Sequence, residues 1–270
     1  MKPNDRVAVV TGAGSGIGKA VASELAHRGA RAVAVVDRSE SVREVASEVN
    51  HAQWRQVLYP FVGDTTDPEF RRHVYDQIGQ IGRVSICVPA AGITRDALAV
   101  KIDKQTGKVV MYPESQFRQV VEVNLVAPTY WAMEMVARVA EDRYRRKLGR
   151  WDPEEKIQAV AIFIGSVSSQ GNKGQIAYAA TKRGLEGAAA TLMKEAIFYG
   201  VRCAVIHPGF TDTPMVRAMG DKLINENILP YTQLRRLIRP EEIAEAICFM
   251  ISNEAVSGEL WADAGWHPSA

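Results

Sequence analysis

Short runs of apolar residues alternate along the chain with longer segments in which apolar positions recur every three or four residues. Such runs are typical of strands buried on both faces, and the periodic segments are typical of amphipathic helices. This alternation predicts an α/β fold, a doubly wound parallel sheet of about seven strands with helices on both faces. The predicted strands are 6–11, 31–37, 57–62, 84–88, 160–164, 201–206 and a last one from residue 258. The predicted helices are 17–29, 41–50, 69–78, 114–139, a segment after residue 178, and 240–252.

The chain is predicted to form one domain over residues 1–270, because no repeat, linker or low-complexity stretch divides it. Two longer connections, called insertions below, interrupt the regular alternation. Residues 101–112 contain the turn-forming pair Thr106-Gly107 before a short apolar run, which predicts a small hairpin near the rim of the site. Residues 141–157 carry the run RYRRK, which indicates either a solvated helix end or a docking site for an acidic protein or a phosphate group.

Composition narrows the classes of function. With 47% hydrophobic and 24% charged residues and a formal net charge of +2, the chain is typical of a soluble globular protein with no excess charge for nucleic acid or an anionic membrane. No stretch reaches the roughly 18 to 20 apolar residues that span a bilayer, and the first residues lead into a strand rather than a signal sequence. The three cysteines lie in apolar runs without CxxC or histidine at metal-ligand spacing, so we expect a cytoplasmic protein without a metal site.

A glycine-rich turn, TGAGSGIG, joins the first strand to the first helix. Gly12 and Gly16 let the backbone approach a pyrophosphate, Gly18 lets helix and strand pack closely, and the helix N-terminus offers amide donors. Asp37 ends the second strand 19 positions after Gly18, the spacing at which a carboxylate accepts hydrogen bonds from an adenosine ribose. The pattern predicts a Rossmann-type site that favours NAD(H), since Asp37 would repel a 2′-phosphate, while the adjacent Arg38 leaves NADP(H) open. The alternative is that Asp37 only ends the strand or caps the next helix.

A candidate acid/base pair lies later in the chain. Tyr178 and Lys182 are four positions apart in a predicted helix, so both side chains leave one face. A phenol with a pKa near about 10 is a weak base at neutral pH, and an adjacent ammonium is expected to lower that pKa. Ser166 follows the strand 160–164, so its hydroxyl is expected where open α/β sheets bind ligands. A Tyr and a Lys at this spacing also occur by chance in many proteins.

Asn124 and Asp64 are two further polar candidates. Asn124 lies within a predicted helix although asparagine is a mediocre helix former. Pro128, four residues on, has no amide to bond the Asn124 carbonyl, so we expect a kink that leaves this carbonyl free. Asp64 follows the third strand and could receive an adenine amino group, whereas Asp67 or Thr66 could equally cap the following helix.

The ordered motifs resemble those of the short-chain dehydrogenase/reductase family over nearly the whole chain. They are TGAGSGIG at 11–18, Asp37, Asp64, the AAG at 90–92, Asn124 in VEVNLVAP, Ser166, YAATK at 178–182 and HPGFTDTPM at 207–215. Within the family, AAGITRD, GNKGQIAYAATK and the PGF turn are most similar to 3-oxoacyl-[acyl-carrier-protein] reductases and related bacterial NAD-dependent dehydrogenases.

The resemblance implies a set of functional residues. Tyr178 would be the general acid/base, Lys182 would lower its pKa and hold the nicotinamide ribose, and Ser166 would hydrogen-bond the substrate oxygen. Asn124 would hold a water that completes a proton relay; the alternative is an asparagine tolerated beside a kink. His207 is expected to be structural. The expected cofactor-binding residues are Gly12, Ser15, Gly16, Ile17, Gly18, Asp37, Asp64, Thr65, Ala91, Gly92, Tyr178, Lys182, Pro208, Gly209, Thr211 and Thr213.

The implied function is an oxidoreductase that moves a hydride between a nicotinamide cofactor and a secondary alcohol or ketone, with a 3-hydroxyacyl/3-oxoacyl thioester favoured. The alternatives are a polyol, sugar or hydroxysteroid dehydrogenase of the same family, and a non-catalytic NAD-binding regulator. Residues 212–238 are expected to cover the substrate, which could be carried by acyl carrier protein or CoA. Small apolar residues near Asn124 and after Tyr178 suggest subunit packing, and the resemblance implies a homotetramer or homodimer.

Two departures from the family pattern bear on the site. Ala90 stands where the family usually has asparagine, and Pro89 has no amide, so a supporting hydrogen bond to the neighbouring strand is expected to be missing and replaced by a local adjustment. Ser166 and Tyr178 are 12 positions apart, slightly fewer than in most members, so the loop between them is expected to be tighter.

Overall fold

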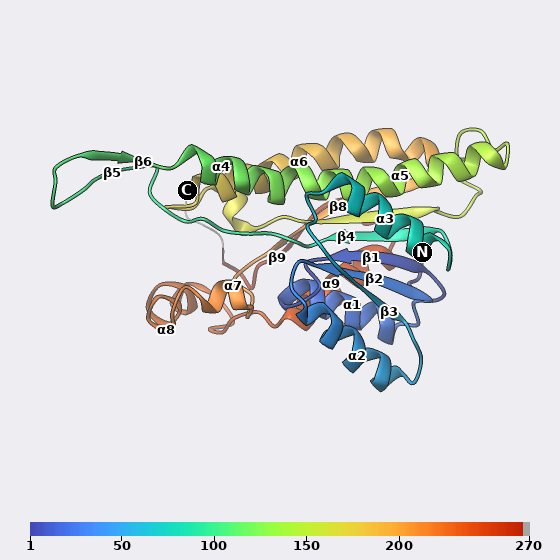
Figure 1. Ribbon diagram of the computed structural model, residues 1–270, viewed down its shortest axis with the longest axis horizontal. Coiled ribbons are helices and arrows are strands. Elements are labelled where there is room, and N and C mark those ends of the chain that lie inside the picture. Colours follow the sequence, from blue (N-terminus) through green and yellow to red (C-terminus); the bar gives the residue numbers. More distant parts are fainter. Residues whose placement is uncertain (267–270) are drawn as a thin grey trace.

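The computed structural model describes residues 1–266 and has a seven-stranded parallel sheet at its centre (Figure 1). The strand order is β3-β2-β1-β4-β7-β8-β9, so the chain starts in the middle, builds one half and then crosses to build the other. The predicted doubly wound α/β fold is confirmed. The strands are β1 (Val7–Thr11), β2 (Ala32–Asp37), β3 (Leu58–Val62), β4 (Val84–Pro89), β7 (Ala159–Ile164), β8 (Val201–Pro208) and β9 (Gly258–Ala262).

Helices cover both faces of the sheet (Figure 1). One face carries α1 (Gly16–His27), α2 (Ser41–Gln53) and α9 (Pro240–Ser252), and the other carries α3 (Pro68–Gly79), α5 (Ala127–Arg145) and α6 (Ile176–Ala196), with 3₁₀ turns η2 (Val167–Gln170) and η3 (Ile197–Tyr199) beside α6. Alternate residues of β1 enter the two cores, Ala8 and Val10 on the first side and Val7 and Val9 on the second. Because both faces are buried, the strands are continuous apolar runs in the sequence.

The predicted helix over 114–139 is three consecutive segments. α4 (Glu114–Val121) leads into a π-helical turn, η1 (Glu122–Val126), which is followed by α5. Pro128 lies in the first turn of α5, where its missing amide is tolerated, and it cannot bond the carbonyl of Asn124 four residues before. The expected irregularity is therefore present as a π turn, a feature that is frequent at functional sites.

The first insertion folds as the predicted hairpin. β5 (Val100–Ile102) pairs antiparallel with β6 (Val109–Met111), and Asp103 closes the turn by accepting hydrogen bonds from two backbone amides. The ribbon projects from the body beside α4 (Figure 1). Its base is tied to the segment before α6 by a 2.8 Å hydrogen bond from the Ala97 amide to the Gly174 carbonyl.

The second insertion lies at the end of the molecule opposite to the hairpin, where α5 ends (Figure 1). Arg143, within the RYRRK run, is buried and donates hydrogen bonds to the Glu155 carboxylate (2.7 Å) and the Gly149 carbonyl (2.9 Å). Arg145 and Arg146 are exposed. The run is thus a helix end with one structural arginine, which favours the first of the two interpretations of its charge.

Residues 212–238 form a chain of short helical segments. Their apolar side chains Ile224, Ile228 and Leu237 form a small cluster separate from the two cores of the sheet. A segment that packs mainly on itself is suited to open and close as a unit. Its role as a substrate cover stays a prediction. The segments are α7 (Pro214–Arg217), α8 (Asp221–Leu223), η4 (Ile224–Ile228) and η5 (Leu229–Tyr231).

Candidate active site

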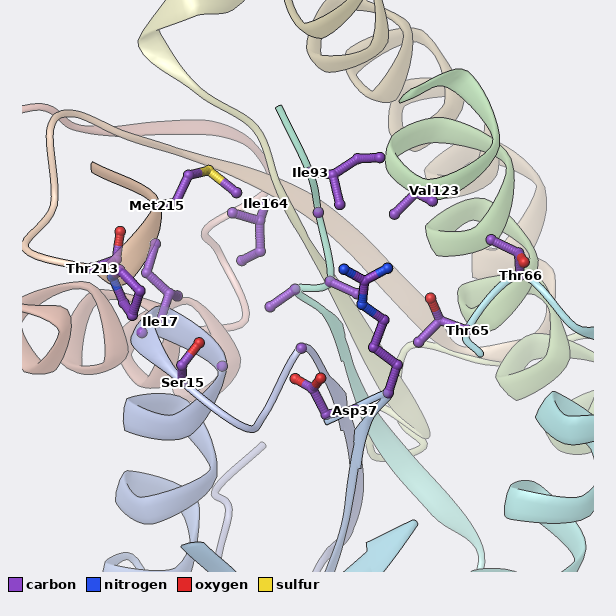
Figure 2. A pocket seen from close by; sticks show the side chains of 18 of the residues that line it. Ser15, Ile17, Asp37, Thr65, Thr66, Ile93, Val123, Ile164, Thr213 and Met215 are labelled. Carbon is purple, nitrogen blue, oxygen red and sulfur yellow. The ribbon is translucent and has the colours of Figure 1, made fainter. Parts of the chain in front are cut away.

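A cavity of about 470 Å³ opens at the carboxyl ends of the strands (Figure 2). It lies over β1 and β4, where the strand order reverses direction, and open α/β sheets bind ligands at this point. The predicted site residues that line it are Gly12, Ser15, Gly16, Ile17, Gly18, Asp37, Asp64, Thr65, Ala91, Gly92, Tyr178, Lys182 and Thr213. The predicted site residues outside its lining are Asn124, Ser166, Pro208, Gly209 and Thr211.

The glycine-rich turn packs too closely against its neighbours to carry side chains. A Cβ on Gly18 would lie 2.2 Å from the Gly12 carbonyl oxygen, and one on Gly12 would lie 2.7 Å from the Ala91 amide nitrogen. Gly12 and Gly16 have φ of +65° and +52°, a region that favours glycine. Among the described residues the Ser15 side chain makes no cap hydrogen bond, so the first amides of α1 are available to a pyrophosphate.

Asp37 is fixed at the end of β2 with its carboxylate toward the cavity (Figure 2). Its two oxygens accept hydrogen bonds from the amides of Gly14 and Ser39, both at 3.0 Å. Neither amide belongs to α2, which begins at Ser41, so Asp37 does not cap that helix. Arg38 is exposed beside it and lines the same cavity. The end of β2 therefore presents one negative and one positive side chain to a ligand.

Asp64 faces the cavity because another residue caps α3. Asp67 is the N-cap and accepts a hydrogen bond from the Glu69 amide at 2.8 Å. Asp64 instead accepts hydrogen bonds from the amide and the hydroxyl of Thr66, both at 2.8 Å. The neighbouring Thr65 is held by its carbonyl, which accepts a hydrogen bond from the buried indole of Trp131. The loop after β3 thus keeps one carboxylate at the edge of the cavity.

The loop after β4 makes its own contact with the neighbouring strand. The hydrogen bond that an asparagine at position 90 would make to the neighbouring strand was expected to be missing. In its place the amide of Ala91 donates a hydrogen bond to the Thr11 hydroxyl on β1 at 3.1 Å. The missing asparagine of the family pattern is therefore replaced by a backbone donor and a threonine acceptor.

Tyr178 and Lys182 lie one turn apart on α6, and both line the cavity. The Lys182 Nζ is 5.4 Å from the centre of the Tyr178 ring. Lys182 is buried, and its ammonium donates a 2.8 Å hydrogen bond to the carbonyl oxygen of Ile164 at the end of β7. Burial lowers the pKa of Lys182 to about 8. The structure thus brings the two predicted side chains together, with the ammonium anchored to the strand end.

The phenol of Tyr178 has a pKa shifted in the direction opposite to the expectation. Desolvation by the protein around the ring raises this pKa to about 12, the Ser166 hydroxyl acts to lower it, and the Asp96 carboxylate acts to raise it. Burial is the largest cause of this shift. The expected lowering of the Tyr178 pKa by Lys182 stays a prediction.

A short connection brings Ser166 next to Tyr178. Ser166 begins the 3₁₀ turn η2, and its hydroxyl accepts a hydrogen bond from the Ser168 amide at 3.1 Å. Gly171 and Gly174, with φ of +104° and +84°, then turn the chain back to α6. The tight connection that the spacing predicts is made by this turn and these two glycines, and the Ser166 hydroxyl comes close enough to act on the Tyr178 pKa.

The segment after β8 contributes Thr213, Pro214 and Met215 to the cavity. Thr213 caps α7, and a Cβ on Gly16 would lie 3.0 Å from its methyl carbon, so the two loops face each other. Gly209 approaches the backbone of Asp263 so closely that a Cβ would lie 2.6 Å from its carbonyl oxygen. Thr211 bonds the Gly209 carbonyl at 3.1 Å. Gly209 and Thr211 therefore shape the turn that presents Thr213.

Several further lining residues were not assigned to the site from the sequence, although some of them lie within the quoted motifs. They are Gly63, Thr66, Ala90, Ile93, Gln119, Glu122, Val123, Ile164, Pro214 and Met215. Figure 2 shows Ile93, Ile164 and Met215 along one side of the cavity, away from Ser15 and Asp37. Ile164 ends a predicted strand, so the rule that ligands bind at strand ends could have found it. The cavity therefore has a polar side and an apolar side.

Comparisons with known proteins agree on one family. A family model described as short chain dehydrogenase matches residues 6–223. The 3-oxoacyl-[acyl-carrier-protein] reductase FabG of Escherichia coli (strain K12) is 32% identical over 258 residues, which are 94% of this chain and 93% of that protein. The acetoacetyl-CoA reductase of Allochromatium vinosum is 30% identical over 259 residues, which are 93% of this chain and 92% of that protein.

A solved structure is similar over almost the whole chain. It is a crystal structure of a candidate NAD(P)-dependent gluconate 5-dehydrogenase from Beutenbergia cavernae, with NADP bound at low occupancy. It has a TM-score of 0.81 and 28% sequence identity and covers 98% of both chains. The sheet order of this chain, its glycine-rich turn at the switch point and the matched family model all indicate the same family. The chain belongs to the short-chain dehydrogenase family and is an oxidoreductase that uses a nicotinamide cofactor.

Proposed function

We propose that the protein reduces the 3-keto group of an acyl thioester to a secondary alcohol. The observation that carries the proposal is the position of Tyr178, which lies beside Ser166 and near Lys182 in a cavity that the glycine-rich turn also lines. The Escherichia coli and Allochromatium vinosum relatives are named as reductases of a 3-oxoacyl carrier thioester and of acetoacetyl-CoA. Both substrates share this reacting group.

The side chains at the cavity have separate tasks in such a reduction. The bound cofactor supplies the hydride. Tyr178 is a neutral phenol at neutral pH, because its pKa is about 12, so it can donate a proton to the substrate oxygen as that oxygen gains negative charge. The Ser166 hydroxyl would donate a hydrogen bond to the same oxygen. The Lys182 ammonium, anchored on the Ile164 carbonyl, would hold the nicotinamide ribose and place positive charge near the phenol.

We infer that the cofactor is NAD(H). The glycine-rich turn and the first amides of α1 would hold its pyrophosphate, and Asp37 its adenosine ribose. Two amides fix the Asp37 carboxylate at the cavity, where a 2′-phosphate would meet a like charge. Arg38 lines the same cavity and would attract that phosphate, and the Beutenbergia cavernae structure is described with NADP. NADP(H) is therefore the alternative.

The apolar side of the cavity favours an acyl substrate over a polyol or sugar. Ile93, Val123, Ile164 and Met215 gather there (Figure 2), and the hydroxyls of a sugar would lose hydrogen bonds to water against such side chains. The similarity to a candidate gluconate dehydrogenase makes a sugar acid the second candidate.

A substrate panel separates the two candidates. Nicotinamide absorbance would be followed with acetoacetyl-CoA and with the keto form of gluconate under the same conditions. We expect a kcat/KM at least about tenfold higher for the thioester, which is the discrimination that one or two apolar contacts provide. The reverse order would favour the sugar acid, and turnover of neither compound would reject both.

We infer that the protein is a homo-oligomer, with a tetramer favoured over a dimer. On α5 the exposed residues Tyr130, Met133 and Ala137 follow helical spacing, and on the adjacent α6 Gly187 and Ala190 are exposed. Exposed apolar and small residues on two neighbouring helices are typical of a subunit interface. Light scattering coupled to size exclusion should give a mass of two or four chains, and a monomer at micromolar concentration would contradict the inference.

We infer a cytoplasmic location from the state of the thiols. Cys87, Cys203 and Cys248 are free and buried, as is usual in a reducing compartment. Within residues 1–266 no helix combines the length and the apolar character needed to cross a membrane. Fractionation of cells that produce the protein would test the inference, which recovery in a membrane or extracellular fraction would contradict.

A further inference from the structure

Three side chains from three different elements converge behind Ser166. Glu186 on α6, His207 on β8 and Glu259 on β9 each place one oxygen or nitrogen atom within 4.8 Å of the other two. The His207 Nε2 is 3.3 Å from Oε2 of Glu259 and 3.9 Å from Oε1 of Glu186. None of the three lines the catalytic cavity. They form a separate cluster that contacts the backbone of Ser166, the residue that is proposed to contact the substrate.

Two of the converging atoms are buried without a hydrogen-bond partner. The side chains of His207 and Glu186 are 0% and 8% exposed. Within residues 1–266, neither the His207 Nε2 nor the Glu186 Oε1 makes a hydrogen bond. Buried polar atoms are nearly always satisfied in folded proteins, and two unsatisfied atoms that face each other are unfavourable for stability. A cation bound between them would satisfy both.

The opposite edge of the imidazole is arranged as in a metal-bound histidine. The His207 Nδ1 is 3.2 Å from the Ser166 carbonyl oxygen, and donation of its proton to that carbonyl leaves a lone pair on Nε2, toward the carboxylates. The ring stacks on Trp261 at 4.2 Å, which fixes its plane. Gly165 leaves room for it, since a Cβ there would lie 2.6 Å from Nδ1. In the other tautomer Nδ1 accepts from the Ser166 amide at 3.3 Å and Nε2 is protonated.

We propose that Glu186, His207 and Glu259 bind one divalent transition-metal ion, with Zn²⁺ the best match. One imidazole nitrogen and two carboxylate oxygens are donors that Zn²⁺ takes at about 2.0–2.2 Å, so that tetrahedral ligand atoms lie about 3.4 Å apart. The 3.3 Å between His207 and Glu259 fits this geometry. The 3.9 Å between His207 Nε2 and Glu186 Oε1 exceeds the ligand separation of a tetrahedral site by about half an ångström, which a side-chain rotation can close. A mixed nitrogen and oxygen site disfavours Mg²⁺ and Ca²⁺, which prefer oxygen ligands.

Charge and access around the cluster suit a divalent cation. Arg183 pairs with Oε2 of Glu186 and leaves Oε1 directed toward His207. The side chain of Glu259 is 41% exposed, so an ion can enter from the surface and a water can complete its coordination. Metal binding at Nε2 would fix the Nδ1 hydrogen bond to the Ser166 backbone. The ion would then support the position of Ser166 without contacting the substrate.

The test is titration of metal-free protein, prepared by dialysis of the full chain against a chelator. Isothermal calorimetry with Zn²⁺ should show one site per chain, and the melting temperature should rise when Zn²⁺ is added. Glu259→Gln should weaken Zn²⁺ binding by about 100-fold and should abolish most of that rise. His207→Asn should do the same, but it alters a buried residue, so Glu259→Gln at its partly exposed position is the decisive variant. Glu245→Gln, at an exposed position on α9, is the matched control and should bind like the wild type.

Cobalt gives an independent readout. Co²⁺ bound by His207 and the two carboxylates should show visible absorption bands that Glu259→Gln removes. The proposal is overturned if the wild type binds neither Zn²⁺ nor Co²⁺, or if Glu259→Gln binds them as tightly as the wild type. It is also overturned if binding is lost in the surface variants His51→Asn or His73→Asn instead, since the site would then be adventitious. Dehydrogenase activity enters none of these measurements, so failure here is distinct from failure of the proposed reaction.

Discussion

The carboxamide of Asn124 makes two hydrogen bonds with the backbone of Ile93: Oδ1 accepts from the Ile93 amide and Nδ2 donates to the Ile93 carbonyl, each at 2.8 Å. Asn124 is fully buried in the π turn, so the pair ties this turn to the loop after β4. A Cβ on Gly92 in that loop would lie 3.5 Å from Oδ1 of Asn124 and 4.0 Å from Nζ of Lys182. The side chain therefore positions the loop beside Lys182. The relay water that the family resemblance implies would be hydrogen-bonded to the Asn124 carbonyl, and it stays a prediction.

Asn124→Ala should lower the free energy of unfolding by about 2 kcal/mol, because it removes two hydrogen bonds to the partly buried backbone of Ile93. It should also reduce kcat, since the loop beside Lys182 loses its anchor. Urea unfolding and steady-state kinetics would measure both effects. Asn227→Ala, at an exposed position in η4, is the control and should change neither. Unchanged stability of Asn124→Ala would show that the hydrogen bonds to Ile93 are not needed to hold the loop.

Tyr178→Phe should reduce kcat by about 10²- to 10⁴-fold, because it removes the proton donor and keeps the ring. Cofactor binding, followed by nicotinamide fluorescence, should stay close to that of the wild type, since the glycine-rich turn and Lys182 are untouched. Tyr144→Phe is the matched control, since this tyrosine is 84% exposed on α5 and should lose no activity. Full turnover by Tyr178→Phe would refute the proposed chemistry.

The parts of the site that the sequence could predict depend on local geometry. Gly12 and Gly18 follow from the spacing of a strand, a turn and a helix, and Asp37 from its distance to that turn along the chain. Tyr178 and Lys182 follow from the helical repeat. The hairpin of residues 100–111 was predictable because a turn-forming pair lies before a short apolar run. In each of these cases the neighbours that determine the position are close in the sequence.

The features that could not be predicted depend on contacts between distant elements. The Tyr178 pKa is raised mainly by burial, which depends on the elements that pack around the ring. His207 was expected to be structural from its place before a proline, and its contacts with Glu186 and Glu259 require α6, β8 and β9 to be packed together. No pattern within one segment contains this information.

The stability of the protein should depend on pH through Lys182. Burial lowers the pKa of this lysine from its ordinary 10.5 to about 8. Between these pH values the unfolded chain binds a proton that the folded chain does not, so the contribution of Lys182 to stability is fully present above about pH 10.5 and is lost as the pH falls to about 8. The full change is about 3 kcal/mol.

The difference in unfolding free energy between the wild type and Lys182→Met isolates this effect, since methionine does not titrate and the other groups are common to both chains. Urea unfolding at pH 7, 8, 9 and 10 should show the wild type gaining stability relative to the variant between pH 8 and 10. Lys101→Met, on the exposed hairpin, should give a difference that does not vary with pH. A flat or reversed slope for Lys182→Met would mean that Lys182 titrates near its ordinary pKa in the folded chain.

Variants at the end of β2 test the preference for NAD(H). Asp37→Asn keeps an oxygen that can accept a hydrogen bond from the Gly14 amide and removes only the charge, whereas Asp37→Ala removes both. Both variants should bind NADPH relatively better, because the repulsion of the 2′-phosphate is gone, and Asp37→Ala should also bind NADH about tenfold more weakly through loss of a charged acceptor for the ribose. Fluorescence titration with NADH and NADPH measures both affinities. Arg38→Ala is the complementary change and should weaken NADPH binding alone. An unchanged ratio of the two affinities in both Asp37 variants would show that the charge of Asp37 does not set the cofactor preference.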